Sequence, residues 1–379
     1  MLPNRRPLAA RTRRSLAAFL VTAATATLFA AAVAAETMPQ LRLIGQQTFD
    51  NRTLTFEGTV PGGLSGIEYD ASSGHYVVIS DDQSVPERGD ARFYTVELDF
   101  DARAFRSFTF TGVTVLKRPD GKPFPASGVD PESIRLLPSG HLLWTSEGLA
   151  ESTPPIAPFV REMRPDGSYV RDLTIPRHFI ATSVGAFGGR HNLVFESLTI
   201  TPGGRWAVTA TEGALLQDGP EATSSTGSPS RVLFIDLETG EPGPEYVYMN
   251  DPVTDATDAF SVNGLVELLA LDESSFLALE RSFSVGFGNS VDLYRFDVSA
   301  AADISTIDSL ANAEVRPNPG AKTLVADLTC LGVTLDNLEG LTWGPTLETG
   351  NPSLVIVSDD NFGYDGFTQF LAFEVLAKP

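Results

Sequence analysis

Short apolar runs separated by turn residues alternate along this chain, and one combination of runs occurs five times. In each copy an apolar strand begins at a polar or acidic residue, and a second strand ends at an acidic residue 15 to 20 residues later. The copies begin at Ser65, Glu132, Glu196, Asn263 and Glu339, at intervals of 67, 64, 67 and 76 residues. Regularly repeated short strands are typical of a β-propeller, although the usual repeat is about 40–50 residues.

The first copy shows how four strands fit into one repeat. Strands are predicted over 65–70, 76–80, 92–98 and 105–116, with a tight turn at 71–74. The last copy contains only three, over 339–343, 353–358 and 369–375. The stretch 41–49 is predicted as a strand that completes the last blade and closes the ring. The prediction is therefore an all-β propeller of five four-stranded blades, with six blades as the alternative.

The repeat also gathers acidic residues. The start of one strand and the end of its antiparallel neighbour lie at the same end of a blade, so both repeated positions should face one rim of the central channel. Ten carboxylates are predicted there: Asp81, Asp82, Glu132, Glu147, Glu196, Glu212, Glu280, Glu339, Asp359 and Asp360. Such crowding raises pKa values or binds cations, and hard oxygen ligands favour Ca²⁺. The alternative is that these residues only cap turns.

Residues 1–35 are predicted to be an export signal. They carry five arginines, followed by an uncharged stretch from 15 to 35 and small residues at 33–35. Segment 12–16 is also a loose twin-arginine pattern, but we favour the general secretory route, with an uncleaved membrane anchor as the alternative. The prediction is a signal over 1–35 and a single domain over 36–379, in the periplasm or secreted.

The net charge limits the classes of partner that the protein can bind, and the cysteine content limits its disulfides. Without the signal, 22 Lys and Arg stand against 48 Asp and Glu, a net charge of −26. A surface this acidic repels nucleic acid and anionic lipid, and no second apolar run is long enough to span a membrane. Cys330 is the only cysteine, so no internal disulfide can form. We expect a monomer that binds a small-molecule substrate.

Five segments, at 130–133, 192–198, 277–283, 336–345 and 358–362, resemble the phytase-like family, described as having esterase-like activity of phytase. The resemblance implies an exported β-propeller with calcium-dependent phosphoester hydrolysis. The chain lacks the Asp-Asp-Pro-Ala signature of established β-propeller phytases and offers few basic residues, so phytate is not the expected substrate. The segment 339–343 is also similar to the Glu-Gly-x-x-Trp of calcium-dependent lactonase propellers.

The first hypothesis is therefore a calcium-dependent hydrolase of phosphoesters or related esters. The predicted metal ligands are Glu132, Glu196, Glu339, Asp81, Asp359, Asp360, Asn263 and Glu280. The predicted catalytic residues are Glu147, Glu212 and His191, and the predicted substrate-binding residues are Arg281, Arg190 and Asn192. Arg281 could equally serve only to pair with a neighbouring Glu. The alternatives are a lactonase-type hydrolase and a non-catalytic binding propeller with structural calcium.

Overall fold

Twenty strands in the described part of the chain are arranged as five four-stranded antiparallel sheets. The computed structural model describes residues 40–182, 185–363 and 366–376, all within a unit that runs from Met38 to Pro379. The predicted export signal and its boundary lie outside the described residues and stay predictions. Among the described residues, no helix is long and apolar enough to cross a membrane.

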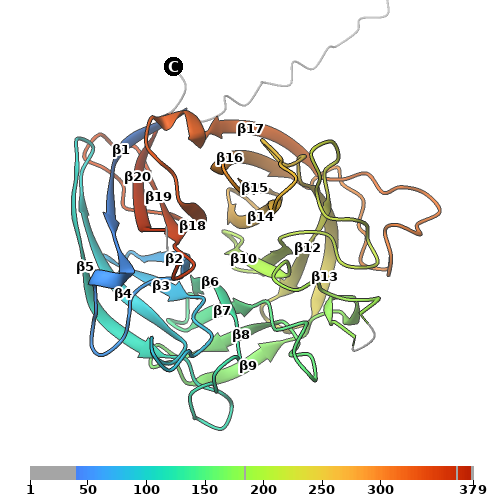
Figure 1. The fold of residues 1–379 in the computed structure, drawn as a ribbon, viewed down its shortest axis with the longest axis horizontal. Helices are drawn as coiled ribbons and strands as arrows, with labels where there is room; N and C mark the ends of the chain where they lie inside the picture. Colours follow the sequence, from blue (N-terminus) through green and yellow to red (C-terminus); the bar gives the residue numbers. More distant parts are fainter. Residues whose placement is uncertain (1–39, 183–184, 364–365, 377–379) are drawn as a thin grey trace, which may run out of the picture. The chain divides into compact units, whose positions relative to one another are not determined.

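The sheets are the blades of a propeller around a common centre (Figure 1). Blade 1 contains β2 (Leu64–Asp70), β3 (His75–Ser80), β4 (Arg92–Phe100) and β5 (Phe105–Val115), and blade 2 contains β6 (Pro131–Leu136), β7 (Leu142–Ser146), β8 (Phe159–Met163) and β9 (Tyr169–Leu173). Blade 3 contains β10 (Phe195–Ile200), β11 (Trp206–Thr211), β12 (Pro229–Asp236) and β13 (Pro242–Met249). Blade 4 contains β14 (Ser261–Ala270), β15 (Ser275–Ser284), β16 (Gly288–Asp297) and β17 (Ala321–Asp327). Short 3₁₀ helices span Asn51–Thr53, Arg177–Phe179 and Leu328–Leu331.

Blade 5 closes the ring. It contains β18 (Asn337–Trp343), β19 (Ser353–Asp359), β20 (Thr368–Leu376) and, as its outer strand, β1 (Gln40–Phe49). β1 pairs antiparallel with β20 from Gln40 opposite Leu376 to Phe49 opposite Thr368. The predicted five blades and their closure by the N-terminal strand are confirmed, and the six-blade alternative is wrong. The inner strands β2, β6, β10, β14 and β18 each contact the next one around the ring.

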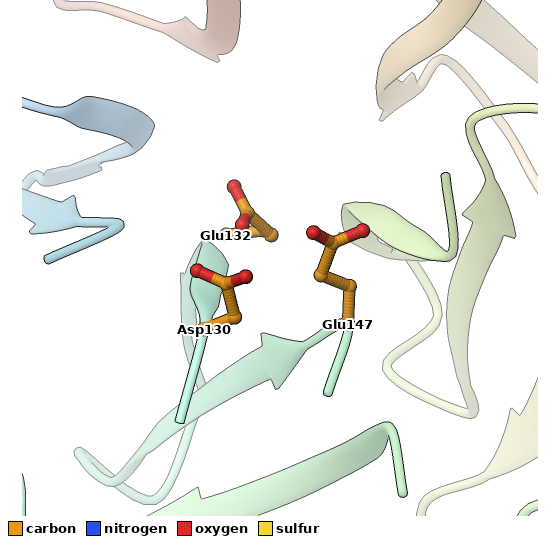
Figure 2. Close-up of side chains that lie close together, drawn as sticks. All are labelled: Asp130, Glu132 and Glu147. Carbon is orange, nitrogen blue, oxygen red and sulfur yellow. The ribbon is translucent and has the colours of Figure 1, made fainter. Parts of the chain in front are cut away.

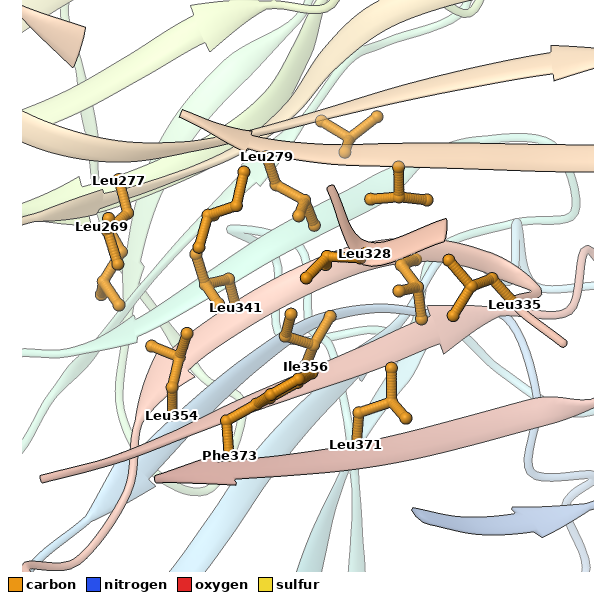
Figure 3. Packing of buried hydrophobic residues seen from close by; sticks show 14 residues of the cluster. Leu269, Leu277, Leu279, Leu328, Leu335, Leu341, Leu354, Ile356, Leu371 and Phe373 are labelled. Atoms are coloured by element: carbon orange, nitrogen blue, oxygen red, sulfur yellow. The ribbon is translucent and has the colours of Figure 1, made fainter. Parts of the chain in front are cut away.

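Apolar side chains fill the spaces between neighbouring blades. Strand residues alternate between the two faces of a sheet, and here each face meets another blade, so both sets of side chains are buried. Figure 3 shows the cluster between blades 4 and 5, where Leu279 of β15 packs with Leu341 of β18 and Ile356 of β19. Clusters in the described residues also fill the other four blade interfaces.

Each inner strand carries a β-bulge near its start. The pairing register shifts at Ser65 in β2, at Glu132 and Ser133 in β6, at Glu196 in β10 and at Glu339 in β18. A bulge places two residues opposite one and re-aims a side chain, which is why bulges recur at functional sites. In three blades the re-aimed position is a glutamate. The repeat found in the sequence is therefore a repeated backbone irregularity with a carboxylate on it.

The fourth copy of the repeat is displaced by three residues, and this corrects the predicted alignment. In the other blades the bulge directly follows the residue that pairs with the position just before the repeated acid, namely Ser80, Ser146, Thr211 or Ser358. In blade 4 that pair is Leu265 with Glu280, and the bulge lies at Val266 rather than at Asn263. The equivalent of the acids that follow the second strands is then Arg281. Blade 4 contributes Val266 and Arg281 where other blades contribute Glu or Asp.

Beyond the bulges, the inner strands approach closely and enclose a buried ion pair. A Cβ on Gly66 would lie 2.6 Å from the carbonyl oxygen of Glu132, so this position requires glycine. Arg135 Nη2 lies 2.8 Å from Glu267 Oε2, and both side chains are almost fully buried. Arg135 also donates to backbone carbonyl oxygens of four blades, at Ile67, Ile134, Leu268 and Leu341. The pair therefore ties the inner strands together near the axis.

Candidate functional site

Eight carboxylates converge at the end of the channel where the inner strands begin. They are Asp81, Asp130, Glu132, Glu147, Glu196, Glu212, Glu339 and Asp359, and all except the partly buried Asp81 are buried. Most of them line a cavity of about 890 Å³. Glu147 is the member that does not line the cavity. Its Oε2 accepts a hydrogen bond from the backbone N–H of Val194 at 3.1 Å. The predicted convergence of repeat positions at one rim is thus present for seven of ten acids.

Two overlapping groups within this ring have the spacing of a cation site. Oxygens of Asp130, Glu132 and Glu147 lie within 4.8 Å of one another, and Figure 2 shows these three side chains pointing into one space. Oxygens of Glu132, Glu196 and Glu339 also lie within 4.8 Å of one another. Glu132 belongs to both groups. The second group takes one glutamate from each of three blades, and all three occupy bulge positions.

The crowding shifts the acidity of the ring. Burial, followed by the charges of Glu196, Asp130 and Glu147, raises the pKa of Glu132 well above its ordinary value. Burial and neighbouring carboxylates likewise raise the pKa values of Glu147, Glu196, Asp81 and Asp359. Burial raises the pKa of Asp130 to about 7. Without a compensating cation, the ring therefore holds protons at neutral pH.

Arg281 is the one Lys or Arg among the described residues that line the cavity. Its Nη2 lies 3.3 Å from Glu212 Oε1 and 3.3 Å from Glu339 Oε1, while its buried Nε has no hydrogen-bond partner. Burial raises the pKa of Glu212 to about 7, although the Arg281 charge acts in the opposite direction. Arg281 therefore serves as an internal counterion of the carboxylate ring, and its buried Nε is a donor without an acceptor.

Asp81 has an incompletely satisfied carboxylate. Its Oδ1 is buried and has no hydrogen-bond partner among the described residues. A Cβ on Gly63 would lie 1.8 Å from this oxygen, so glycine, at a φ of +57°, leaves the room that the carboxylate occupies. An orphaned buried oxygen beside a ring of carboxylates fits a hard cation as the missing partner.

Several predicted site residues lie elsewhere or are committed to structural contacts. Asp82 accepts from the guanidinium of Arg92 at 3.1 Å, and Asp360 accepts from Asn51 Nδ2 at 2.7 Å and from the backbone of Gly63. Asp360 borders the cavity, but these donors already occupy its oxygens. Asp82 and Asp360 therefore hold the loops beside β3 and β19 in place.

Asn263 and Glu280 are not brought to the carboxylate ring. They bond to each other at 2.7 Å, and Glu280 also accepts from Tyr248 Oη and Lys322 Nζ on the far side of the hairpin. The reason is the three-residue displacement of blade 4, which turns Arg281 toward the cavity and Glu280 away from it. Their prediction as metal ligands is corrected.

The predicted residues of the 190–192 loop separate into two groups. His191 and Asn192 are exposed and line the cavity mouth, and Asn192 has a left-handed φ of +57°. Arg190 does not line the cavity. It donates to the carbonyl oxygens of Ala214 and Gly219 and lies 3.4 Å from Glu221, which does line the cavity.

Sequence reasoning missed Asp130 and Asn337 as site residues. Asp130 lies two residues before the bulge at Glu132, and Asn337 lies two residues before the bulge at Glu339. Asn337 Nδ2 donates to Glu339 Oε1 at 2.8 Å and to Asp359 Oδ2 at 3.2 Å. Residues two apart on a strand face the same side, so a period-two inspection of the segments before the bulges could have found both.

The comparisons with known proteins follow this geometry. A family model described as "Phytase-like: Esterase-like activity of phytase" matches residues 59–362. The chain belongs to this family. The match spans all five copies of the repeat, so the carboxylate ring lies within the region shared by phytase-like propellers. No curated protein matches the chain.

The solved structures that match the chain are distant from it in sequence. An endo-arabinase from Bacteroides thetaiotaomicron has 10% identity and a TM-score of 0.44, over 86% of this chain and 98% of the enzyme. The catalytic domain of an α-L-arabinofuranosidase from Coprinopsis cinerea has 11% identity and a TM-score of 0.42, over 90% and 99%. A luciferin-regenerating enzyme has 9% identity and a TM-score of 0.37, over 86% and 95%. At this distance the matches indicate nothing about chemistry.

Proposed function

We propose that this phytase-like propeller is an exported, calcium-dependent hydrolase of phosphoesters or related esters, acting in the cavity at the carboxylate ring. The observation that carries the proposal is the group formed by Glu132, Glu196 and Glu339, whose oxygens lie within 4.8 Å of one another on three different blades. The family's description as esterase-like and the signal pattern over residues 1–35 support hydrolysis and export respectively.

The donor set fits calcium. All candidate ligands are carboxylate oxygens, which hard divalent cations prefer, and Asp81 adds a buried oxygen without a partner. Glu132, Glu196 and Glu339 would hold the ion, with Asp81 and Asp359 beside them. Bound calcium supplies charge neutralisation, orientation of ester oxygens and a lowered pKa for a coordinated water.

The chain's own side chains divide the remaining tasks. Arg281 would bind an anionic ester oxygen, because it is the one guanidinium among the described residues that line the cavity. Glu212 lines the cavity and has a pKa of about 7, which suits a general base that takes a proton from water near neutral pH. Glu147 is the weaker candidate because it does not line the cavity. His191 and Asn192 lie where a leaving group would pass.

A second candidate is hydrolysis of a carboxylic ester or lactone in the same cavity. The single arginine favours it, because a substrate with several phosphates would meet ten carboxylates and only one guanidinium among the described lining residues. Both candidates use the same carboxylate ring. They differ in the bond that is hydrolysed, which is a phosphoester bond in the first and a carboxylic ester or lactone bond in the second.

One experiment separates these functions from a purely structural role. EDTA-treated protein is assayed with and without millimolar calcium against 4-nitrophenyl phosphate, 1-naphthyl acetate and a lactone panel. Glu339→Gln removes one ring carboxylate, and Glu238→Gln makes the same change at an exposed turn as a control. We expect calcium-dependent turnover of the phosphoester that Glu339→Gln abolishes and Glu238→Gln preserves. Turnover of a lactone alone would favour the second candidate, and calcium-dependent melting without any turnover would reject catalysis.

A further inference from the structure

Blade 4 rises above the rim that the other blades share. β14 is 10 residues long, whereas the other inner strands contain six or seven. β15 is also 10 residues long, whereas the second strands of the other blades contain five to seven. The pairs Ser261 with Ser284, Val262 with Phe283 and Asn263 with Ser282 all lie beyond the pair of Gly264 with Arg281. These extra pairs are the insertion that displaces the fourth copy of the repeat, and they stand beside the cavity.

Strand alternation gives this extension two different faces. Phe260, Val262 and Phe283 line the cavity. The alternate residues are serines that face the other side, where Ser282 Oγ accepts from Thr254 N at 2.9 Å and Ser284 Oγ donates to Thr254 O at 3.0 Å. The serine face is thus covered by the segment around Thr254, and the apolar face is left toward the cavity.

The three apolar residues Phe260, Val262 and Phe283 form an apolar wall. Phe260 is 66% exposed, and its ring contacts Phe283 with a centroid separation of 6.3 Å. Single exposed apolar residues are ordinary on protein surfaces, but a wall of three that borders one polar cavity is typical of a ligand site. Phe283 is two residues from Arg281 on the same face of β15, so the wall begins next to the cavity's guanidinium.

We propose that the apolar wall binds the alkyl, acyl or aryl group of the substrate, so that the preferred esters are amphiphiles whose polar ester group lies at the carboxylate ring. This inference rests on the proposed function. Charge disfavours the opposite class, because a polyanionic polyol would have to place several phosphates against the carboxylate ring with only Arg281 and bound calcium to compensate. An ester with one anionic group needs only that arginine and calcium at one end and apolar contact at the other.

The chain offers a matched pair of variants for the test. Phe260 and Phe287 are 66% and 68% exposed, but only Phe260 lines the cavity. Phe260→Ala and Phe287→Ala therefore remove equally exposed rings from the same blade, and neither should lower the melting temperature by more than a degree or two. Binding of methyl phosphate and hexyl phosphate to the calcium-loaded protein is measured by calorimetry, and turnover of 1-naphthyl phosphate and glycerol 2-phosphate is measured in parallel.

We expect hexyl phosphate to bind about 30-fold more tightly than methyl phosphate, because its methylene groups leave water for the wall. Phe260→Ala should weaken hexyl phosphate binding and lower kcat/KM for 1-naphthyl phosphate by about tenfold, with methyl phosphate and glycerol 2-phosphate unchanged. Phe287→Ala should change each value by less than about twofold.

The outcomes distinguish this inference from the proposed function. A hexyl preference that depends on Phe260, without turnover of any ester, would support the wall and refute hydrolysis. Turnover with equal affinity for methyl and hexyl phosphate would support hydrolysis and overturn the wall. Binding to phosphatidylcholine vesicles that both variants weaken alike, with no hexyl preference, would overturn it in favour of a membrane surface.

Discussion

Two arginines lie near the axis of this propeller, and their surroundings differ. Arg135 is almost fully buried and donates to Glu267 and to carbonyl oxygens of four blades. Glu267 in turn accepts from the backbone of Leu198 and Leu268 and from Ser133 Oγ. Arg281, by contrast, makes no hydrogen bond to a backbone carbonyl among the described residues and contacts only two members of the carboxylate ring, Glu212 and Glu339, each at 3.3 Å. The Nε of each arginine is buried without a hydrogen-bond partner, so the difference lies in their other contacts.

The comparison distinguishes a structural ion pair, Arg135 with Glu267, from a candidate functional site, the carboxylate ring. A buried charge whose partners are nearly complete holds strands together and leaves little for a ligand. A ring with excess negative charge, an orphaned Asp81 oxygen and an open cavity is satisfied only by something added from outside. The first region should respond to mutation but not to calcium, and the second should respond to both.

The largest effect is expected when the buried ion pair of Arg135 and Glu267 is broken. Arg135→Met leaves the Glu267 carboxyl buried without its cation, so we expect a loss of about 3–5 kcal/mol in the free energy of unfolding. Urea denaturation with and without calcium measures it, and the loss should be the same in both conditions. The double variant Arg135→Met/Glu267→Leu should recover much of the stability. A loss below about 1 kcal/mol would mean that the pair does not hold the inner strands.

The pH dependence of the calcium-free protein tests the acidic ring. Burial raises the pKa values of Asp130 and Glu212 to about 7, above the ordinary values of 3.8 and 4.5. The folded protein then keeps protons that the unfolded chain has released, so the free energy of unfolding falls as pH rises from about 4 to about 7. In EDTA we expect a loss of several kcal/mol across that interval, since each unit by which a pKa is raised corresponds to about 1.4 kcal/mol, and saturating calcium should reduce the loss. A free energy of unfolding that rises with pH in EDTA would contradict the raised pKa values of the ring carboxylates.

Removal of one carboxylate from the ring should reduce the stabilisation by calcium and should stabilise the calcium-free protein. At 100 times its dissociation constant, calcium should stabilise the natural protein by about 2.7 kcal/mol. Glu196→Gln should lose most of this gain, yet in EDTA it should be about 1 kcal/mol more stable because it relieves repulsion. Calcium-titrated melting curves measure both effects. Equal calcium stabilisation in the variant and the natural protein would remove Glu196 from the site.

The smallest effect concerns the space around Asp81. Gly63→Ala and Gly74→Ala both place a side chain at a positive φ, which should cost each about 1 kcal/mol in the free energy of unfolding. Gly63→Ala should lose more than this, because its Cβ would also lie 1.8 Å from Asp81 Oδ1 and 2.5 Å from the Phe362 ring. Only the Cβ at position 63 meets Asp81 Oδ1, while position 74 has no atom within 4 Å. We therefore expect calcium affinity to fall in Gly63→Ala and to stay unchanged in Gly74→Ala, as followed by calorimetry. Equal affinities would place Asp81 outside the cation site.

The blade architecture could be predicted because the strand pattern is periodic and the unpaired segment 41–49 needs a partner. The register of blade 4 could not, because Asn263-Gly264-Leu265 matches the motif locally while the ladder pairs Leu265 with Glu280. A bulge adds one residue without a sequence signal, so the face of Glu280 was predicted wrongly. Asp130 could not be predicted from the repeated strand starts, because it lies two positions before the bulge at Glu132.

The most direct test of the central claim is a calcium titration of EDTA-treated protein, followed by hydrolysis of 1-naphthyl phosphate and by melting temperature in the same samples. If the group formed by Glu132, Glu196 and Glu339 binds calcium and is the site of hydrolysis, activity and melting temperature should rise together with one apparent dissociation constant. Both responses should be largely lost in Glu196→Gln and should persist in Glu238→Gln. Activity that is unchanged by EDTA, or calcium binding that survives in Glu196→Gln, would contradict the claim.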